Sequence, residues 1–456
     1  MKAYKNINMT HSLILINPWI YDFAAYDLWS KPLGLLYLAG FLKHSGFNVH
    51  FIDCLNRYYP GMPDNNLYKV PKNRLYGTGK FWRMQIEKPY SLKHIQRPYS
   101  RYGISIKAFE EELSKVKNPV ALLVTSLMTY WYPGVKEAIK VARKIHPGVT
   151  VILGGIYARL CNEHAVKTSG ADIVVTETDP TSILKILNDI GIEKPEHISD
   201  LQPVPYPAFY LLDKIDYVCL LTSTGCPFTC RYCASRFLSP HMKRRDPHEI
   251  LEEIVYWRKT FGVRDFAFYD DALLVDSKNH VSILLESIER LDMDLRFHLP
   301  NAIHAKELSA EIASLMRRTG FKTIRIGLET SDFSIHKDID NKISEGDFER
   351  AISNLLNAGF KKTDIGAYIL VGLPGQSVDS VLETIDFVAG NGAIPYLSEY
   401  SPIPHTDLWE EAVKYSEYDI SAEPLFQNNT LLPCWDNFKR KEFEKLRKRA
   451  LEVRRV

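Results

Sequence analysis

Three cysteines within residues 226–233 constrain this chain more than any other feature of its sequence. Cys226, Cys230 and Cys233 are separated by four and three positions and directly follow the strand-like run 217–222. A structural zinc site needs four ligands, usually supplied as two separated pairs, and no clear fourth ligand lies nearby. Cubane iron–sulfur clusters are commonly held by four thiolates, so three would leave one iron open to a small molecule. We therefore expect such a cubane here. Zinc binding and a chance grouping of thiols are the alternatives.

Length and composition indicate a multidomain globular protein. The chain has 456 residues, more than one hydrophobic core usually serves, so we expect two or three domains. No apolar run is long enough to span a membrane, and residues 1–17 lack a secretion-signal cleavage site, so we expect them to supply a first strand. Seven cysteines, an odd number with four of them scattered, favour a reducing compartment such as the cytoplasm over a disulfide framework.

Residues 1–195 alternate strand-like and helical segments, which predicts a Rossmann-like α/β domain with a parallel sheet covered on both faces. The expected strands are 13–16, 49–52, 120–124, 149–153 and 173–175. In open α/β sheets, ligands bind beyond the carboxyl ends of the strands. The loops at those ends therefore hold the candidate binding residues, which are Trp19, Thr125, Ser126, Leu127, Gly154, Gly155, Thr176 and Glu177.

Residues 57–105 interrupt this domain with a basic and aromatic insertion. Ten lysines and arginines face only two acidic residues between positions 57 and 102. The aromatic content indicates order, because disordered segments are poor in aromatic residues. Three interpretations stay open: a lid that brings cations to an anionic substrate, a nucleic-acid surface that combines phosphate contacts with stacking, and a packed insertion with a solvated basic rim.

Residues 196–216, with prolines at 203, 205 and 207, indicate an extended linker. Between 217 and 406 a strand–helix pattern repeats about six times, which predicts an open, partial (β/α)6 barrel with its site at the carboxyl ends of the strands. The expected strands are 218–223, 266–269, 296–299, 323–326, 364–371 and 396–401. Residues 407–456 are expected to form a small helical C-terminal extension.

Several strand ends of this barrel carry candidate site residues. Asp270 and Asp271 follow the second strand, and Glu329 ends the fourth. The turn after the fifth strand contains Gly372 and Gly375, whose backbone could approach a ligand closely. The alternatives are a helix cap for the aspartates, a surface carboxylate for Glu329 and a plain structural turn for the glycines.

The spacing Cys226-x3-Cys230-x2-Cys233, with Tyr232 before the last cysteine, resembles the radical S-adenosylmethionine (SAM) superfamily. The resemblance implies a [4Fe-4S] cluster whose open iron binds SAM, and cleavage of SAM to a 5′-deoxyadenosyl radical. It also implies SAM contacts from Tyr232, Asp270, Asp271, Glu329, Gly372 and Gly375. His405 stands where relatives often carry glycine, and it could reach substrate as an acid or base; packing or surface exposure is the alternative.

The N-terminal half resembles the cobalamin-binding domain that precedes many radical SAM cores, on the runs 32–39, 125–129 and 153–155. This resemblance implies cobalamin as a third cofactor, held by the eight candidate residues at the sheet edge; a domain that only scaffolds the barrel is the alternative. The expected reaction is methylation of an unactivated carbon in a small molecule, such as a natural product or lipid, that could be anionic. A flavodoxin or ferredoxin would supply the electron.

Two other function classes stay open. A radical SAM enzyme could catalyse a cyclisation, rearrangement or coupling without methyl transfer. A non-enzymatic iron–sulfur protein could instead bind nucleic acid through residues 57–102, and salt-dependent binding that survives Cys230→Ala would distinguish it.

Overall fold

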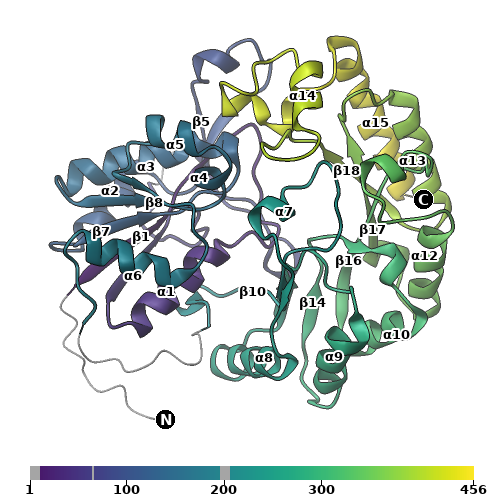
Figure 1. The fold of residues 1–456 in the computed structure, drawn as a ribbon, viewed down its shortest axis with the longest axis horizontal. Helices are drawn as coiled ribbons and strands as arrows, with labels where there is room; N and C mark the ends of the chain where they lie inside the picture. The colour runs from purple at the N-terminus through teal and green to yellow at the C-terminus, as the bar shows by residue number, and fades with distance from the viewer. Residues whose placement is uncertain (1–10, 64–65, 196–205, 456) are drawn as a thin grey trace. The chain divides into compact units, whose positions relative to one another are not determined.

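The computed structural model describes residues 11–63, 66–195 and 206–455, which divide into two compact units, Met1–Ile215 and Asp216–Val456 (Figure 1). Residues 196–205 of the expected linker, with two of its three prolines, and residues 64–65 of the insertion lie outside the described residues. Within the described ranges, no helix combines the length and hydropathy needed to cross a membrane. We describe each unit by itself.

Unit 1 is built on a parallel sheet of five strands in the order β3-β1-β7-β8-β9. The strands are β1 (Ser12–Asn17), β3 (Asn48–Asp53), β7 (Ala121–Val124), β8 (Thr150–Leu153) and β9 (Ile173–Val174). The main helices are α1 (Leu33–His44), α2 (Ile106–Ser114), α3 (Tyr132–Ile145) and α6 (Pro180–Asp189), and the short α4 (Ile156–Leu160) and α5 (Asn162–Thr168) follow β8.

Alternation along β1 explains why both faces of this sheet are covered. Leu13 and Leu15 pack with apolar residues of α1 and α6, whereas Ile14 and Ile16 pack with those of α2 and α3. Successive side chains of a strand point to opposite faces, so a continuous apolar run places a helix layer on each side. Figure 1 shows α2 and α3 on one side of the sheet and α1 and α6 on the other.

A separate antiparallel sheet in the order β2-β6-β5-β4 combines three strands of the insertion with β2, which precedes the insertion in the sequence. Its strands are β2 (Ile20–Asp22), β4 (Tyr68–Lys69), β5 (Arg83–Ile86) and β6 (Tyr99–Tyr102). Phe81, Tyr99 and Tyr102 are buried, so part of its aromatic content serves as a core. The insertion is thus packed, as one of the three interpretations expects.

Unit 2 contains six strands that follow one another in sequence order and pair in parallel. They are β10 (Val218–Leu220), β13 (Asp265–Phe268), β14 (Arg296–His298), β16 (Phe321–Glu329), β17 (Ile365–Val371) and β18 (Ile394–Glu399). β10 and β18 are the two ends of this order, so the barrel is partial. The predicted fold class, a parallel α/β sheet followed by a partial six-stranded barrel, is confirmed.

Helices outside the strands complete unit 2 (Figure 1). They are α8 (Pro247–Phe261), α9 (Val281–Glu289), α10 (Ala310–Thr319), α11 (His336–Ile339), α12 (Asp347–Asn357), α13 (Val378–Gly390), α14 (Trp409–Tyr415) and α15 (Asn437–Arg455). In α15, Leu446 and Ala450 are buried, and the Arg454 guanidinium donates to the Pro395 carbonyl at 2.7 Å. The C-terminal helix therefore packs on the last strand of the barrel.

Candidate functional site

The three cysteines lie in a loop of residues 225–234, here called the cluster loop, between β11 (Ser223–Thr224) and α7 (Ser235–Leu238). β11 pairs with β12 (Lys243–Arg244). Gly225 has a φ of +78°, and a Cβ atom there would lie 2.7 Å from the His241 carbonyl oxygen. Only glycine fits such a position without strain, so Gly225 sets the direction in which the loop leaves the sheet.

Asp270 anchors the chain that enters the cluster loop. Its Oδ1 accepts hydrogen bonds from the Thr222 and Ser223 hydroxyls at 2.6 and 2.7 Å, and from the Ser223 backbone at 2.6 Å. The carboxylate is buried, and its Oδ1 accepts these three hydrogen bonds. Asp270 therefore positions the strand before the loop, and its expected contact with SAM stays a prediction.

The three thiols differ in exposure, with Cys226 and Cys230 half-buried and Cys233 exposed. Burial raises the pKa of both half-buried thiols, that of Cys230 to about 12, and the neighbouring Cys233 raises each further. Cys233 donates to the Ser235 hydroxyl at 3.3 Å, and this hydroxyl donates to Asp271 at 3.0 Å. A cation bound at this loop would favour the thiolate forms of Cys226 and Cys230.

The donor set fits an iron–sulfur cluster. Within the described residues, no three His, Cys, Asp or Glu side chains converge as ligands of a single ion. A cubane does not require such convergence, because each thiolate binds a different iron. Three soft sulfur donors on one loop are the ligand type that iron–sulfur clusters prefer.

A buried ion network connects the cluster loop to the end of β16. Lys342 lies with its Nζ 2.7 Å from Oε1 of Glu329, and it donates to the Tyr232 hydroxyl at 2.8 Å. Asp340 is 3.8 Å from the same ammonium. Glu329 has a φ of +67°, which is uncommon outside glycine and often marks functional sites. The network therefore fixes two of the expected SAM contacts, Tyr232 and Glu329, relative to each other.

His336 completes this network. Its Nδ1 lies 2.9 Å from Oδ1 of Asp340, and its Nε2 lies 3.0 Å from the Thr330 carbonyl. Burial alone would raise the pKa of Asp340, but the His336 hydrogen bond and the Lys342 charge lower it below its ordinary value. Asp340 therefore stays ionised and balances part of the Lys342 charge.

His304 stands beside the cluster loop and was not foreseen from the sequence. It lies on β15 (Ile303–His304), which pairs with β16, and its ring centroid is 4.3 Å from that of Phe228 in the loop. Burial, followed by the Lys342 charge, lowers the pKa of His304 to about 3, so the imidazole is neutral. Its Nδ1 is buried without a hydrogen-bond partner among the described residues, which is rare in folded proteins.

The last two barrel loops also carry expected residues. Gly372 and Gly375 have φ values of +98° and +72°, and the Gln376 side chain accepts from the Gly372 backbone at 2.8 Å. His405 is exposed, has a φ of +68° and stacks on Phe237 of α7, with ring centroids 4.1 Å apart. The stacking connects the loop after β18 to the helix that follows the cluster loop.

In unit 1, the predicted binding loops follow β1, β7, β8 and β9, which are neighbours in the parallel sheet, so they lie along one edge. Ser126 connects two of them, because its hydroxyl donates to the Gly154 carbonyl at 2.7 Å. Thr125 and Leu127 flank it, half-buried, and Thr176 and Glu177 are exposed beyond β9.

Trp19 is the exception among these residues. Its side chain is 1% exposed, and its indole N–H donates to the Ile104 carbonyl at 2.7 Å. It also packs edge-on against Phe109. The indole therefore belongs to the core of unit 1, and the expected ligand contact of Trp19 stays a prediction that this burial does not favour.

The glycine pair after β8 yields a prediction with an internal control. A Cβ at Gly155 would lie 2.2 Å from the Ser126 carbonyl oxygen, and Gly155 has a φ of +95°. Gly155→Ala is therefore expected to lower the free energy of unfolding by about 1–3 kcal/mol from backbone strain alone. A Cβ at Gly154 meets no atom within 4 Å, so Gly154→Ala should leave stability nearly unchanged. Urea denaturation of both variants measures these changes. Equal losses of unfolding free energy in the two variants would contradict a strain that is specific to position 155.

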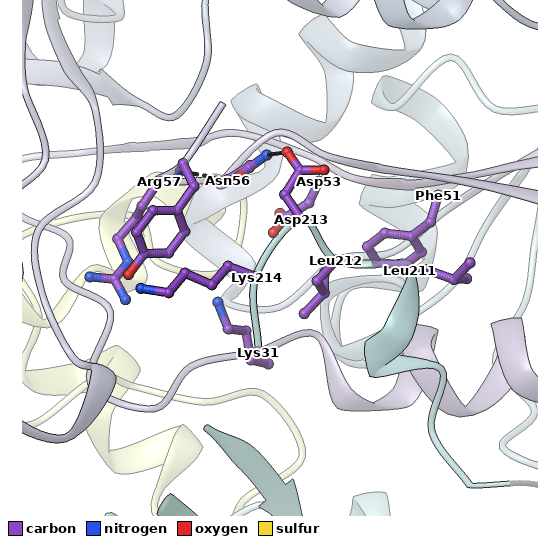
Figure 2. A pocket seen from close by; sticks show the side chains of 10 residues that line it. Lys31, Phe51, Asp53, Asn56, Arg57, Leu211, Leu212, Asp213 and Lys214 are labelled. Atoms are coloured by element: carbon purple, nitrogen blue, oxygen red, sulfur yellow. Dashed lines mark hydrogen bonds between the residues drawn. The ribbon is translucent and has the colours of Figure 1, made fainter. Parts of the chain in front are cut away.

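A pocket in unit 1 lies at the carboxyl end of β3, next to the end of β1 (Figure 2). Its charged lining residues are Lys31, Asp53, Arg57, Asp213 and Lys214. Asn56 donates to Asp213 at 2.6 Å, and Asp53 accepts from Asn17 at 2.7 Å. The pocket thus carries three cationic and two acidic side chains, and none of the predicted site residues lines it.

Comparison with known proteins identifies the class. Residues 220–388 match the model of the radical SAM superfamily. A Pyrococcus horikoshii protein described as an uncharacterized methyltransferase is 22% identical over 334 residues, covering 66% of this chain and 71% of that protein. The cytidylyl-2-hydroxyethylphosphonate methyltransferase of Streptomyces wedmorensis is 20% identical over an alignment of 480 positions, covering 89% of this chain and 82% of its own.

A solved structure shows the same fold over both units. The radical S-adenosylmethionine methyltransferase TsrM of Kitasatospora setae, determined with cobalamin and a [4Fe-4S] cluster bound, has a TM-score of 0.62 at 15% identity, over 90% of this chain and 76% of TsrM. A cysteine loop at the mouth of a partial barrel defines this chain as a radical SAM enzyme. Residues 220–388 carry its radical SAM domain, and the fold of the chain as a whole is similar to that of TsrM.

Proposed function

We propose that this enzyme methylates an unactivated carbon of a small molecule with a [4Fe-4S] cluster, SAM and cobalamin. The observation that carries the proposal is the combination, in one chain, of a three-thiol loop at a barrel mouth and a parallel sheet with an open ligand edge. The relatives named methyltransferases and the cobalamin in the TsrM structure support it. We retain 1–195, 196–216, 217–406 and 407–456 as the proposed domain boundaries.

Residues of unit 2 would hold the cluster and SAM. Cys226, Cys230 and Cys233 would bind three irons, and the SAM contacts would come from Tyr232, Asp271, Glu329, Gly372 and Gly375. When bound, the cluster and SAM supply a 5′-deoxyadenosyl radical, and cobalamin supplies a methyl carrier. Lys342 orients Tyr232 and Glu329 before any ligand arrives, since it contacts both. His405 stays a candidate acid or base toward substrate, held in place by Phe237.

The sheet edge of unit 1 would hold cobalamin through Thr125, Ser126, Leu127, Gly154, Gly155, Thr176 and Glu177. The fit rests on Gly154, where a Cβ would meet no atom within 4 Å, so the backbone there is open to a large planar ligand. Ser126 keeps the two central loops at a fixed separation through its bonds to Gly154 and Ile156. An aromatic contact from Trp19 is not part of this proposal.

The substrate would be a small molecule, such as a natural product or lipid, that could be anionic. A flavodoxin or ferredoxin would supply the electron in a reducing cytoplasm, the compartment that the odd and scattered cysteines favour.

The test is anaerobic reconstitution with iron, sulfide and hydroxocobalamin, followed by metal analysis and incubation with SAM, reductant and candidate substrates. We expect stoichiometric cobalt and, with the right substrate, both 5′-deoxyadenosine and S-adenosylhomocysteine. Iron without cobalt would contradict the methylation proposal. If such a protein forms 5′-deoxyadenosine but no S-adenosylhomocysteine, the enzyme catalyses a cyclisation, rearrangement or coupling instead.

A further inference from the structure

Residues 66–80 of the insertion form a surface loop, here called the basic loop, that exposes apolar and cationic side chains together. Val70 and Leu75 are 66% and 76% exposed. Four cations, Lys69, Lys72, Arg74 and Lys80, are also exposed, and the sequence from 66 to 80 contains no acidic residue. Exposed apolar side chains that are grouped and surrounded by polar residues commonly mark an interaction site.

A neighbouring segment extends this surface. Tyr26 and Leu28 are 43% and 51% exposed, and the charged ends of Arg74 and Lys80 each lie 5.6 Å from the Tyr26 ring centroid. Backbone hydrogen bonds of 3.0 and 2.8 Å join Asp27 and Gly79. The two segments therefore form one continuous basic and apolar surface.

A buried arginine holds the basic loop in shape. The Arg57 side chain is 1% exposed and pairs with Asp27 at 3.1 Å. It donates to the Thr78 carbonyl at 3.1 Å, to Asn73 at 3.0 Å and to the Gly77 carbonyl. Hydrogen bonds to a charged group are stronger than neutral ones. The exposure of Leu75 is thus a property of a fixed loop, and the surface is preorganised for docking.

We propose that the basic loop, together with Tyr26 and Leu28, docks on the surface of an anionic lipid bilayer. Lysines and arginines near such a surface are attracted to its negative headgroups, and adjacent apolar side chains can enter the interface. A protein partner would instead match a continuous apolar centre with a polar rim. Here the exposed apolar residues are direct sequence neighbours of cations, as in Lys69-Val70 and Arg74-Leu75, which suits an anionic lipid surface. Docking would bring the enzyme to substrates dissolved in a membrane.

The test is co-sedimentation of the full-length protein with vesicles of phosphatidylcholine alone or mixed with phosphatidylglycerol. We expect binding to the mixed vesicles only. Added salt should weaken this binding, because it screens the attraction between the cations and the anionic headgroups. Lys69→Glu with Lys72→Glu, and separately Val70→Ser with Leu75→Ser, should each reduce the vesicle affinity by about tenfold or more. All four side chains are at the surface, so circular dichroism should be unchanged.

Matched controls lie elsewhere in unit 1. Lys107→Glu with Lys140→Glu makes the same charge change at side chains that are 81% and 76% exposed, and Val166→Ser removes an apolar side chain that is 59% exposed. These variants should bind like the wild type. Equal loss in controls and loop variants, or equal binding to neutral vesicles, would overturn the proposal. So would an absence of vesicle binding with loop-dependent binding to an acidic flavodoxin, which would assign the surface to a protein.

Discussion

Cys230→Ala is expected to abolish iron–sulfur cluster assembly and SAM cleavage together. Three thiolates are the smallest set that holds a cubane with one open iron, so loss of one leaves too few ligands. Cys230 also lies beside Tyr232 and Lys342, in the half-buried part of the loop. Anaerobically reconstituted protein should contain almost no iron and form no 5′-deoxyadenosine.

The control for this variant is another free thiol. Cys161 lies between α4 and α5 in unit 1, and Cys161→Ser should retain iron and SAM cleavage. A Cys230→Ala protein that keeps full iron and cleaves SAM at the wild-type rate would contradict the ligand assignment. Loss of iron in both variants would show that the effect reflects general instability.

Lys342→Met is expected to cause the largest loss of stability among single substitutions at the site. Removal of one partner of a buried ion pair leaves uncompensated charge, at a cost of about 3–5 kcal/mol. Here Glu329 would be left buried, with Asp340 balanced only by His336. We expect a decrease of this size in the free energy of unfolding, measured by urea denaturation of the reconstituted enzyme.

Two further variants test whether the loss of stability comes from the buried ion network. Lys337→Met removes an exposed lysine of α11 and should change stability little. Glu329→Gln combined with Lys342→Met removes both charges and should recover part of the loss. If the two substitutions instead lower the free energy of unfolding by the sum of their separate effects, Lys342 and Glu329 act independently. That result would contradict the interaction that their 2.7 Å contact implies.

The strand–helix alternation predicted most of the fold because each parallel strand is a short apolar run closed by a turn. All six barrel strands appear within a few residues of their expected bounds, as with the fourth, which the sequence placed at 323–326 and which spans Phe321–Glu329. The strands β5 and β6 of the insertion were not predicted. With the sequences Arg-Met-Gln-Ile and Tyr-Ser-Arg-Tyr, these strands are too short and too polar to show the alternation of a strand with one buried face.

Only those residues of the candidate site that belong to a short sequence motif could be predicted. The cysteine spacing and the glycine turns are local, since each depends on neighbouring residues. Lys342 contacts Tyr232, which is 110 positions away, and no pattern near either residue indicates the pair. The burial of Asp270 and Trp19 was not predictable for a related reason: their hydrogen-bond partners, Thr222 and Ile104, are distant in the sequence.

The central claim is that this chain cleaves SAM reductively at a cluster held by Cys226, Cys230 and Cys233. The most direct measurement is a single-turnover incubation of the reconstituted protein with SAM and a low-potential reductant, with the nucleosides quantified. The account predicts 5′-deoxyadenosine in the wild type and Cys161→Ser proteins and none in Cys230→Ala. An iron-replete wild type that forms no 5′-deoxyadenosine with any substrate or reductant, or formation that persists in Cys230→Ala, would contradict it.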